Sequence, residues 1–150
     1  MFRIYLTQYP SFREVQLKPE LKYHNVTIDL DKVTLVEPPL VSERDIIEYD
    51  WSFHRVVVSK GVGDRFPRPN SFGTPFVVVA NGQRCYLGGI WTSVSSVGTH
   101  LPIIDEMDAR DDCFEIQLGY PGRWDTLQDP REDSRIYKTL KQLGKLKCTQ

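Results

Sequence analysis

The sequence lacks the features that mark disulfide-stabilised, redox-active and membrane-spanning proteins. It has three cysteines in 150 residues, and Cys85, Cys113 and Cys148 form no Cys-x-x-Cys pair for metal or redox chemistry. A single disulfide between Cys85 and Cys113 is possible if their strands are neighbours. No run approaches the roughly 18 apolar residues of a membrane-spanning helix, so we expect no membrane span in this chain. Residues 1–7 are too short and too polar for an export signal.

The charge balance gives the chain no overall attraction to nucleic acid. There are 19 basic and 20 acidic residues, and the net charge is -1. Without an excess of positive charge, no field draws in phosphate backbones or anionic membrane surfaces. The lysines at 138, 141, 145 and 147 are interpreted as the solvated face of a helix. We therefore predict no nucleic-acid partner.

Hydrolase motifs are missing as well. His24, His54 and His100 occur without an HExxH, HxH or GxSxG motif. Each has a carboxylate nearby in sequence, such as Asp50 for His54, but a lone histidine in a strand or turn is more often structural. We therefore predict no catalytic residue, no metal ligand and no cofactor, and we favour a protein that is not an enzyme.

A β-hairpin at 74–91 is the clearest feature that is present. Two apolar, β-rich runs meet across Asn81-Gly82, and these two residues readily take the positive φ that a type I′ turn requires. The length of the chain suits one domain, 1–150, with a sizeable core. The hairpin is informative about the fold, but it contains no residues that indicate a reaction.

Other segments predict further strands and one C-terminal helix. Alternating or apolar patterns indicate short strands at 2–7, 14–18, 26–30, 32–36, 54–59 and 113–118. Residues 42–49 have a weak capping-box pattern for a helical turn. Ile136, Leu140 and Leu143 follow helical spacing, with Asp129 as N-cap, Glu132 at N3 and Gly144 at the end. The fold class is α+β, mainly an antiparallel β-sheet or sandwich with one C-terminal helix.

Two groups of residues are candidates for binding. Asp105, Asp108, Asp111 and Asp112 could supply oxygen ligands to calcium, but their spacing does not match a DxDxDG loop, so a solvated acidic turn is favoured. The loops at 61–73 and 121–125 would present side chains from a rigid β scaffold. The preferred partner contacts there are Arg65, Arg68, Arg123 and Trp124. Trp91 continues the hairpin and is expected in the core.

Residues 41–96 also carry a resemblance to a known family. The features are the Ser-Glu-Arg-Asp-Ile-Ile segment at 42–47, a short strand at 54–59, and an apolar strand at 75–80 that returns through Tyr-Leu-Gly-Gly at 86–89. Their order resembles the periplasmic head domain of the SecD family of protein-export membrane proteins. It is also similar to uncharacterised secreted or lipid-anchored bacterial domains. The resemblance implies a ferredoxin-like α+β module in the bacterial cell envelope and transfers no functional residue.

We therefore expect a non-enzymatic binding or accessory domain of the cell envelope that contacts a protein or peptide. One alternative is a small metal-dependent hydrolase that uses the acidic turn and a histidine. Another is an inhibitor or immunity-type protein, and a cytoplasmic location is the alternative to the envelope. An exposed hairpin edge would also allow two copies to pair as a dimer.

Overall fold

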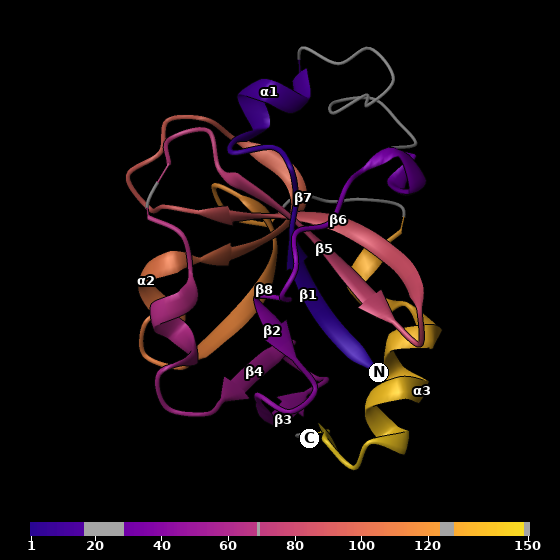
Figure 1. The fold of residues 1–150 in the computed structure, drawn as a ribbon. Helices are drawn as coiled ribbons and strands as arrows, with labels where there is room; N and C mark the ends of the chain where they lie inside the picture. The colour runs from indigo at the N-terminus through magenta and orange to yellow at the C-terminus, as the bar shows by residue number, and fades with distance from the viewer. Residues whose placement is uncertain (17–28, 69, 124–127, 149–150) are drawn as a thin grey trace.

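The protein is described by a computed structural model that covers residues 1–16, 29–68, 70–123 and 128–148. Nine strands follow one another in the order β2-β1-β5-β6-β7-β8-β4-β3-β9 (Figure 1). The strands are β1 (Phe2–Leu6), β2 (Val41–Ser42), β3 (Ile46–Asp50), β4 (Arg55–Val58), β5 (Thr74–Ala80), β6 (Gln83–Trp91), β7 (Thr99–Asp105), β8 (Cys113–Tyr120) and β9 (Leu146–Lys147). The helices are α1 (Phe12–Gln16), α2 (Glu106–Ala109) and α3 (Ser134–Gln142), and the 3-10 turns are η1 (Leu30–Lys32), η2 (Val62–Arg65) and η3 (Pro130–Glu132).

Most neighbouring strands are antiparallel, which confirms the predicted mainly antiparallel α+β fold. Within the described chain, only the β6–β7 and β3–β9 pairs are parallel. The strands join in one continuous order, so a sheet is confirmed and a sandwich is not. No helix among the described residues has the length and apolar character to cross a membrane.

The central hairpin is confirmed. Val77 pairs with Leu87, and Asn81 and Gly82 both have positive φ, 51° and 78°. The β5 side of the hairpin is covered by β1, whereas β6 pairs with β7 only from Gly89 to Trp91. Among the described residues no strand pairs with the outer side of β6 before Gly89, so pairing of two copies through the hairpin edge stays a prediction; β2 and β9 stand at the two ends of the strand order.

Three of the local predictions are wrong. The described part of 14–18 lies in α1, which buries Phe12 against the Trp91 ring at 5.7 Å. At 32–36 the chain forms a 3-10 turn and a single bridge, because Arg84 binds the carbonyls of Leu30 and Val33. Of 26–30, residues 26–28 lie outside the described part of the chain.

The third wrong prediction is the helical turn at 42–49. Asp45 does accept hydrogen bonds from the Ser42 backbone N–H at 2.8 Å and its hydroxyl at 3.2 Å, as a capping box would suggest. The chain then enters β3, where Ile46 and Tyr49 are buried against the core. Tertiary packing outweighs the local helical signal because both side chains point inward from a strand.

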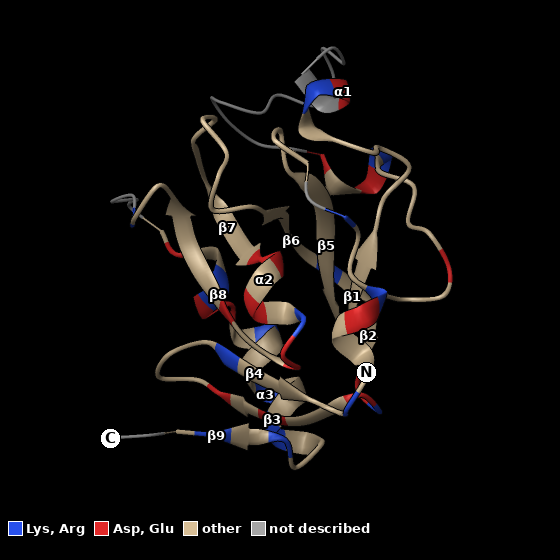
Figure 2. Cartoon of the chain, turned by 90° about the vertical axis from the view of Figure 1, so that its left-hand side faces the viewer, with Lys and Arg blue, Asp and Glu red and all other residues tan. Residues whose placement is uncertain are grey.

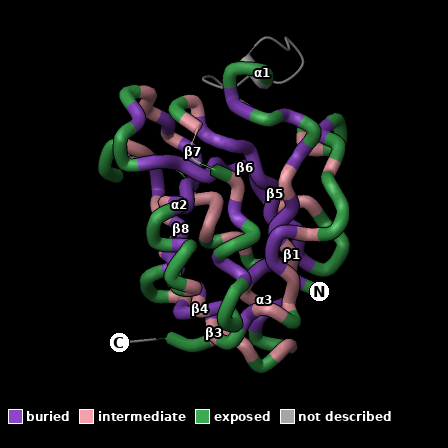
Figure 3. Tube along the Cα trace, turned by 60° about the vertical axis from the view of Figure 1, so that its left-hand side comes forward, coloured by how far each residue is buried: buried purple, intermediate pink, exposed green. Residues whose placement is uncertain are grey.

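Much of the strand backbone belongs to buried residues (Figure 3), and these form two apolar clusters, one on each face of the sheet. On one face Phe2, Ile4, Phe76, Val78, Ile104, Phe114 and Ile116 pack with Ile136 and Leu140 of α3. On the other face Tyr5, Val77, Val79, Leu87, Trp91 and Ile103 pack together with Phe12 and Val33. The predicted core position of Trp91 is confirmed, since 1% of it is exposed.

The C-terminal helix is confirmed, but it begins later than predicted. Asp129 caps η3 by accepting from the Arg131 backbone N–H at 3.0 Å, and Asp133 then caps α3 through the Arg135 N–H at 2.9 Å. Gly144 has φ 71° just beyond the helix. The three residues between the two caps form η3, which contributes to the site described below.

The acidic segment contains a helix and not only a turn. Asp105 caps α2 by accepting from the Met107 N–H at 2.9 Å. Asp112 accepts from the N–H groups of Gly61 and Gly63 at 3.0 and 2.7 Å, which fastens the loop that contains η2. Cys85 and Cys113 are both free thiols, so the bridge that the sequence left open does not form.

Candidate functional site

A buried histidine and two acidic residues come together where β4 begins. His54 is 2% exposed, and its Nε2 lies 2.8 Å from Oε1 of Glu132. Its Nδ1 lies 2.8 Å from the Tyr49 hydroxyl. Trp51 donates its indole N–H to the other Glu132 oxygen at 3.1 Å. Tyr49 and Trp51 come from the end of β3 and Glu132 from η3, so distant parts of the chain hold the imidazole.

The backbone at His54 is tied to the sheet. His54 has a positive φ of 49°, which few residues other than glycine adopt but which His, Asn and Asp tolerate best. Its carbonyl accepts from the Ile116 N–H of β8 at 2.8 Å. Since β4 pairs with β8 only as far as Arg55 and Glu115, His54 turns away at the point where that pairing stops.

Arg131 continues the contact with β8 beyond the first residue of β4. It donates to the Ile116 carbonyl at 2.8 Å and forms an ion pair with Asp129 at 2.7 Å. Both side chains are largely buried, and the guanidinium contacts both carboxylate oxygens of Asp129. We call His54, Asp129, Glu132 and their partners Tyr49, Trp51 and Arg131 the His54 cluster.

Burial and charge set the protonation of the His54 cluster. Burial lowers the pKa of His54, although Glu132 partly opposes the shift. Burial raises the pKa of the Tyr49 hydroxyl well above its usual value. Burial would also raise the pKa of Asp129, but the hydrogen bonds from Arg131 outweigh it and the pKa falls. At neutral pH the imidazole is therefore neutral between a phenol and a carboxylate.

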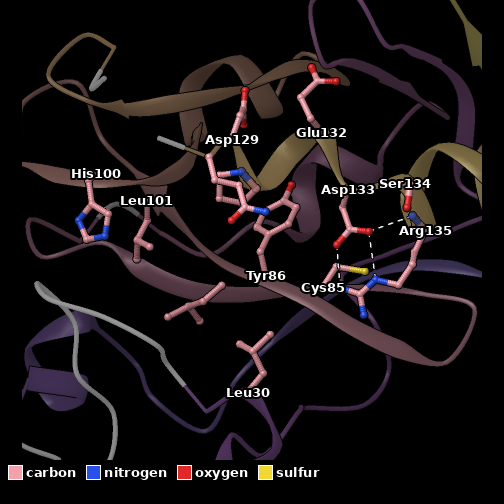
Figure 4. Close-up of a pocket in the computed structure, with 13 residues that line it drawn as sticks. Leu30, Cys85, Tyr86, His100, Leu101, Asp129, Glu132, Asp133, Ser134 and Arg135 are labelled. Atoms are coloured by element: carbon pink, nitrogen blue, oxygen red, sulfur yellow. Dashed lines mark hydrogen bonds and ion pairs between the residues drawn. The ribbon is translucent and has the colours of Figure 1, made fainter. Parts of the chain in front are cut away.

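A groove of about 880 Å³ opens beside this cluster. Leu30, Leu87 and Leu101 give it apolar lining, and the segment from Gln128 to Arg135 forms a charged side. In Figure 4, Asp133 and Arg135 lie beside Cys85 at one end of the groove and His100 lies toward the other end. Asp129 and Glu132 belong to both the groove and the His54 cluster.

One buried polar group in the groove has no partner in the described part of the chain. Tyr86 of β6 is 6% exposed, and the described residues provide no hydrogen bond to its hydroxyl. Burial raises the pKa of this hydroxyl far above its usual value, so it remains a donor. A buried donor of this kind is stabilised when a bound molecule offers an acceptor.

The structure does not gather the predicted partner contacts at this groove. Arg65 donates to Asp45 at 2.9 Å and is half exposed. Arg68 is exposed and lines a second pocket, of about 630 Å³, beside Tyr9 and Phe72. Arg123 is exposed in the turn after β8. Trp124 lies outside the described residues.

Sequence reasoning named one member of the His54 cluster but not its partners. It paired His54 with Asp50, whereas the structure pairs it with Tyr49 and Glu132. Glu132 and Asp129 appeared only as helix-capping residues, because nothing local relates them to a histidine more than 70 positions earlier. His100 lines the groove, and His24 lies outside the described residues.

Acidic and basic residues are unevenly distributed along the fold (Figure 2). Acidic side chains gather around α2 and the start of β8, and the pKa of Asp108 is raised by burial and by the negative charges of Asp105, Glu115 and Asp111. Lysines 138 and 141 are exposed on α3. The lining of the groove includes none of these acidic residues and has side chains of both signs.

No protein-family model, curated protein or solved structure matched this chain. Its site is therefore interpreted from its own geometry.

Proposed function

We propose that this protein is a non-enzymatic binding domain that holds an extended segment of a protein partner in the groove between β6 and the 128–135 segment. The observation that carries the proposal is the lining of the groove. Its apolar side chains suit the side chains of a bound segment, and Tyr86 offers an unused buried donor to a backbone carbonyl. Asp133 and Arg135 form an ion pair at 2.7 Å on the rim and would offer one charge of each sign to the charged side chains of a bound segment.

The scaffold supports such a role. The groove is built from β6, β7 and η3; β6 is fixed there by pairing with β5, β7 by pairing with β8, and η3 by the buried Arg131 contacts. Binding to a rigid surface costs less conformational entropy than binding that must first order a loop. The loop residues Arg65, Arg68, Arg123 and Trp124 stay predicted secondary contacts, and placement in the bacterial cell envelope stays part of the proposal.

The hydrolase hypothesis gains no support from the acidic segment. Asp105 and Asp112, two of its four candidate ligands, accept hydrogen bonds from backbone N–H groups. Among the described residues, the grouping of possible metal ligands lies at the His54 cluster and not there.

Selection of a random peptide library displayed on phage, with the purified chain immobilised, tests the proposal. We expect enriched peptides whose affinity falls at least about tenfold in Arg135→Glu, because reversing a rim charge converts an attraction into a repulsion. Lys138→Glu makes the same charge change on α3 outside the groove and should leave the affinity within about twofold. Failure to enrich any peptide, or equal losses in both variants, would overturn the proposal.

A further inference from the structure

We propose that His54, Asp129 and Glu132 bind one divalent transition-metal ion of the zinc type. One ligand atom from each residue lies within 4.8 Å of the other two, with no ion in place. Ligand atoms around a tetrahedral zinc ion lie roughly 3.3 Å apart, given bond lengths near 2.0 Å. A modest closing movement therefore suffices, and Glu132, whose side chain is 53% exposed, can make it.

Each of the three ligands is oriented by a second residue, as metal ligands in proteins usually are. The Tyr49 hydroxyl contacts Nδ1 of His54, which leaves Nε2 directed at Glu132. Trp51 holds one oxygen of Glu132. Arg131 holds the carboxylate of Asp129, which keeps further lone pairs for an ion. On metal binding, Nδ1 would carry the proton and donate it to the Tyr49 oxygen.

The charge of the group suits a dication. Two carboxylates and one guanidinium leave a single negative charge around a neutral imidazole. A bound dication would replace the His54–Glu132 hydrogen bond with two coordinate bonds. Because imidazole nitrogen is a ligand for zinc, cobalt and nickel while calcium and magnesium prefer oxygen alone, the group should select against the latter two.

The ion has a path to the site. Asp129 and Glu132 line the groove, so an ion could enter from solvent there and keep water as its remaining ligand. The inference does not depend on a peptide partner, and its test contains none.

Isothermal titration calorimetry of the chain with zinc chloride, and with cobalt chloride followed by its visible absorption, tests the site. We expect one ion per chain, a raised melting temperature with zinc, and no comparable effect of calcium or magnesium. Asp129→Asn and Glu132→Gln should each weaken zinc binding by roughly tenfold or more. Both variants keep hydrogen-bonding side chains of nearly the same shape, so they are expected to fold.

Asp133→Asn is the matched control, since Asp133 is a neighbouring cap outside the group. It should bind zinc as the unchanged chain does. Absence of zinc binding would overturn the inference. So would equal binding by all three variants, or a thiolate-to-cobalt charge-transfer band, because each would show that any ion is held elsewhere, for example by a cysteine.

Discussion

Asp112 fixes a loop through its charge. Its carboxylate accepts from the backbone N–H groups of Gly63 and Gly61, and these hydrogen bonds lower its pKa below the usual 3.8. Its φ of 61° is one that Asn also tolerates, so Asp112→Asn changes the charge with little backbone strain. Gly63 has no room for a side chain, because an added Cβ would meet the Ala109 carbonyl and the Asp112 carboxylate. The absence of a side chain there lets the loop backbone approach the Asp112 carboxylate closely.

The pH dependence of stability should therefore change in Asp112→Asn. A carboxyl group whose pKa is lower in the folded state adds stability above its unfolded pKa and loses it as the pH falls below about 4. Urea denaturation at pH 6 and pH 3.5 should show a smaller loss for Asp112→Asn than for the unchanged chain. Asp111→Asn, at the exposed neighbour, should keep the original loss. Equal losses in all three would contradict the assignment.

His54 shows why the candidate site could not be predicted at the scale of single residues. The types His, Asp and Glu are visible in the sequence, but their proximity depends on β8, which binds the His54 carbonyl and the Arg131 guanidinium through one residue, Ile116. The spacing of these residues in the sequence does not indicate that their side chains lie close together. Positions that are distant in sequence became neighbours only through the strand order.

Among the elements, turns with a steric requirement were predictable and short polar strands were not. Asn81-Gly82 predicts a hairpin and the spacing of Ile136 and Leu140 predicts a helix, and both elements are present. The pattern at 32–36 was overruled by the Arg84 side chain, which occupies carbonyls that a strand partner would need. Because this arginine is more than 50 positions away, the residue pattern at 32–36 cannot indicate its effect.

Gly73 and Gly82 make a matched test of how the hairpin is packed. Both have φ 78°, but an added Cβ at Gly73 would lie 2.2 Å from the Trp91 ring, whereas at Gly82 nothing lies within 4 Å. Gly82→Ala should cost about 1–2 kcal/mol from backbone strain alone. Gly73→Ala should cost a further 1–3 kcal/mol or so, because the core must move. Chemical denaturation measures both, and equal costs would contradict the packing described.

At the scale of the whole molecule, two very short strands protect the sheet. The edges β2 and β9 are each two residues long, and β9 covers β3 through bonds from the Tyr49 and Trp51 N–H groups to the carbonyls of Lys145 and Lys147, at 2.8 and 2.7 Å. Exposed, unpaired edge strands promote association between copies. β9 therefore acts as a cover for the longer β3.

Removing β9 should make the protein associate. A chain that ends at Gly144 exposes the N–H groups of β3, and it should sediment as dimers or larger species in analytical ultracentrifugation. A chain that ends at Lys147 keeps β9 and should sediment as the full chain does. If the two truncated chains sediment alike, edge protection by β9 is not what keeps copies apart.

The strand order also affects when the strands can pair during synthesis of the chain. The β3–β4 hairpin is synthesised before its neighbours on the two sides, β8 and β9, which follow it much later in the sequence. At roughly 5–20 residues per second, translation takes several seconds to supply them. During that interval the apolar hairpin waits beside the ribosome without its native partners. In a cell that makes this protein, the β3–β4 hairpin can complete its native pairing only after β8 and β9 have been synthesised.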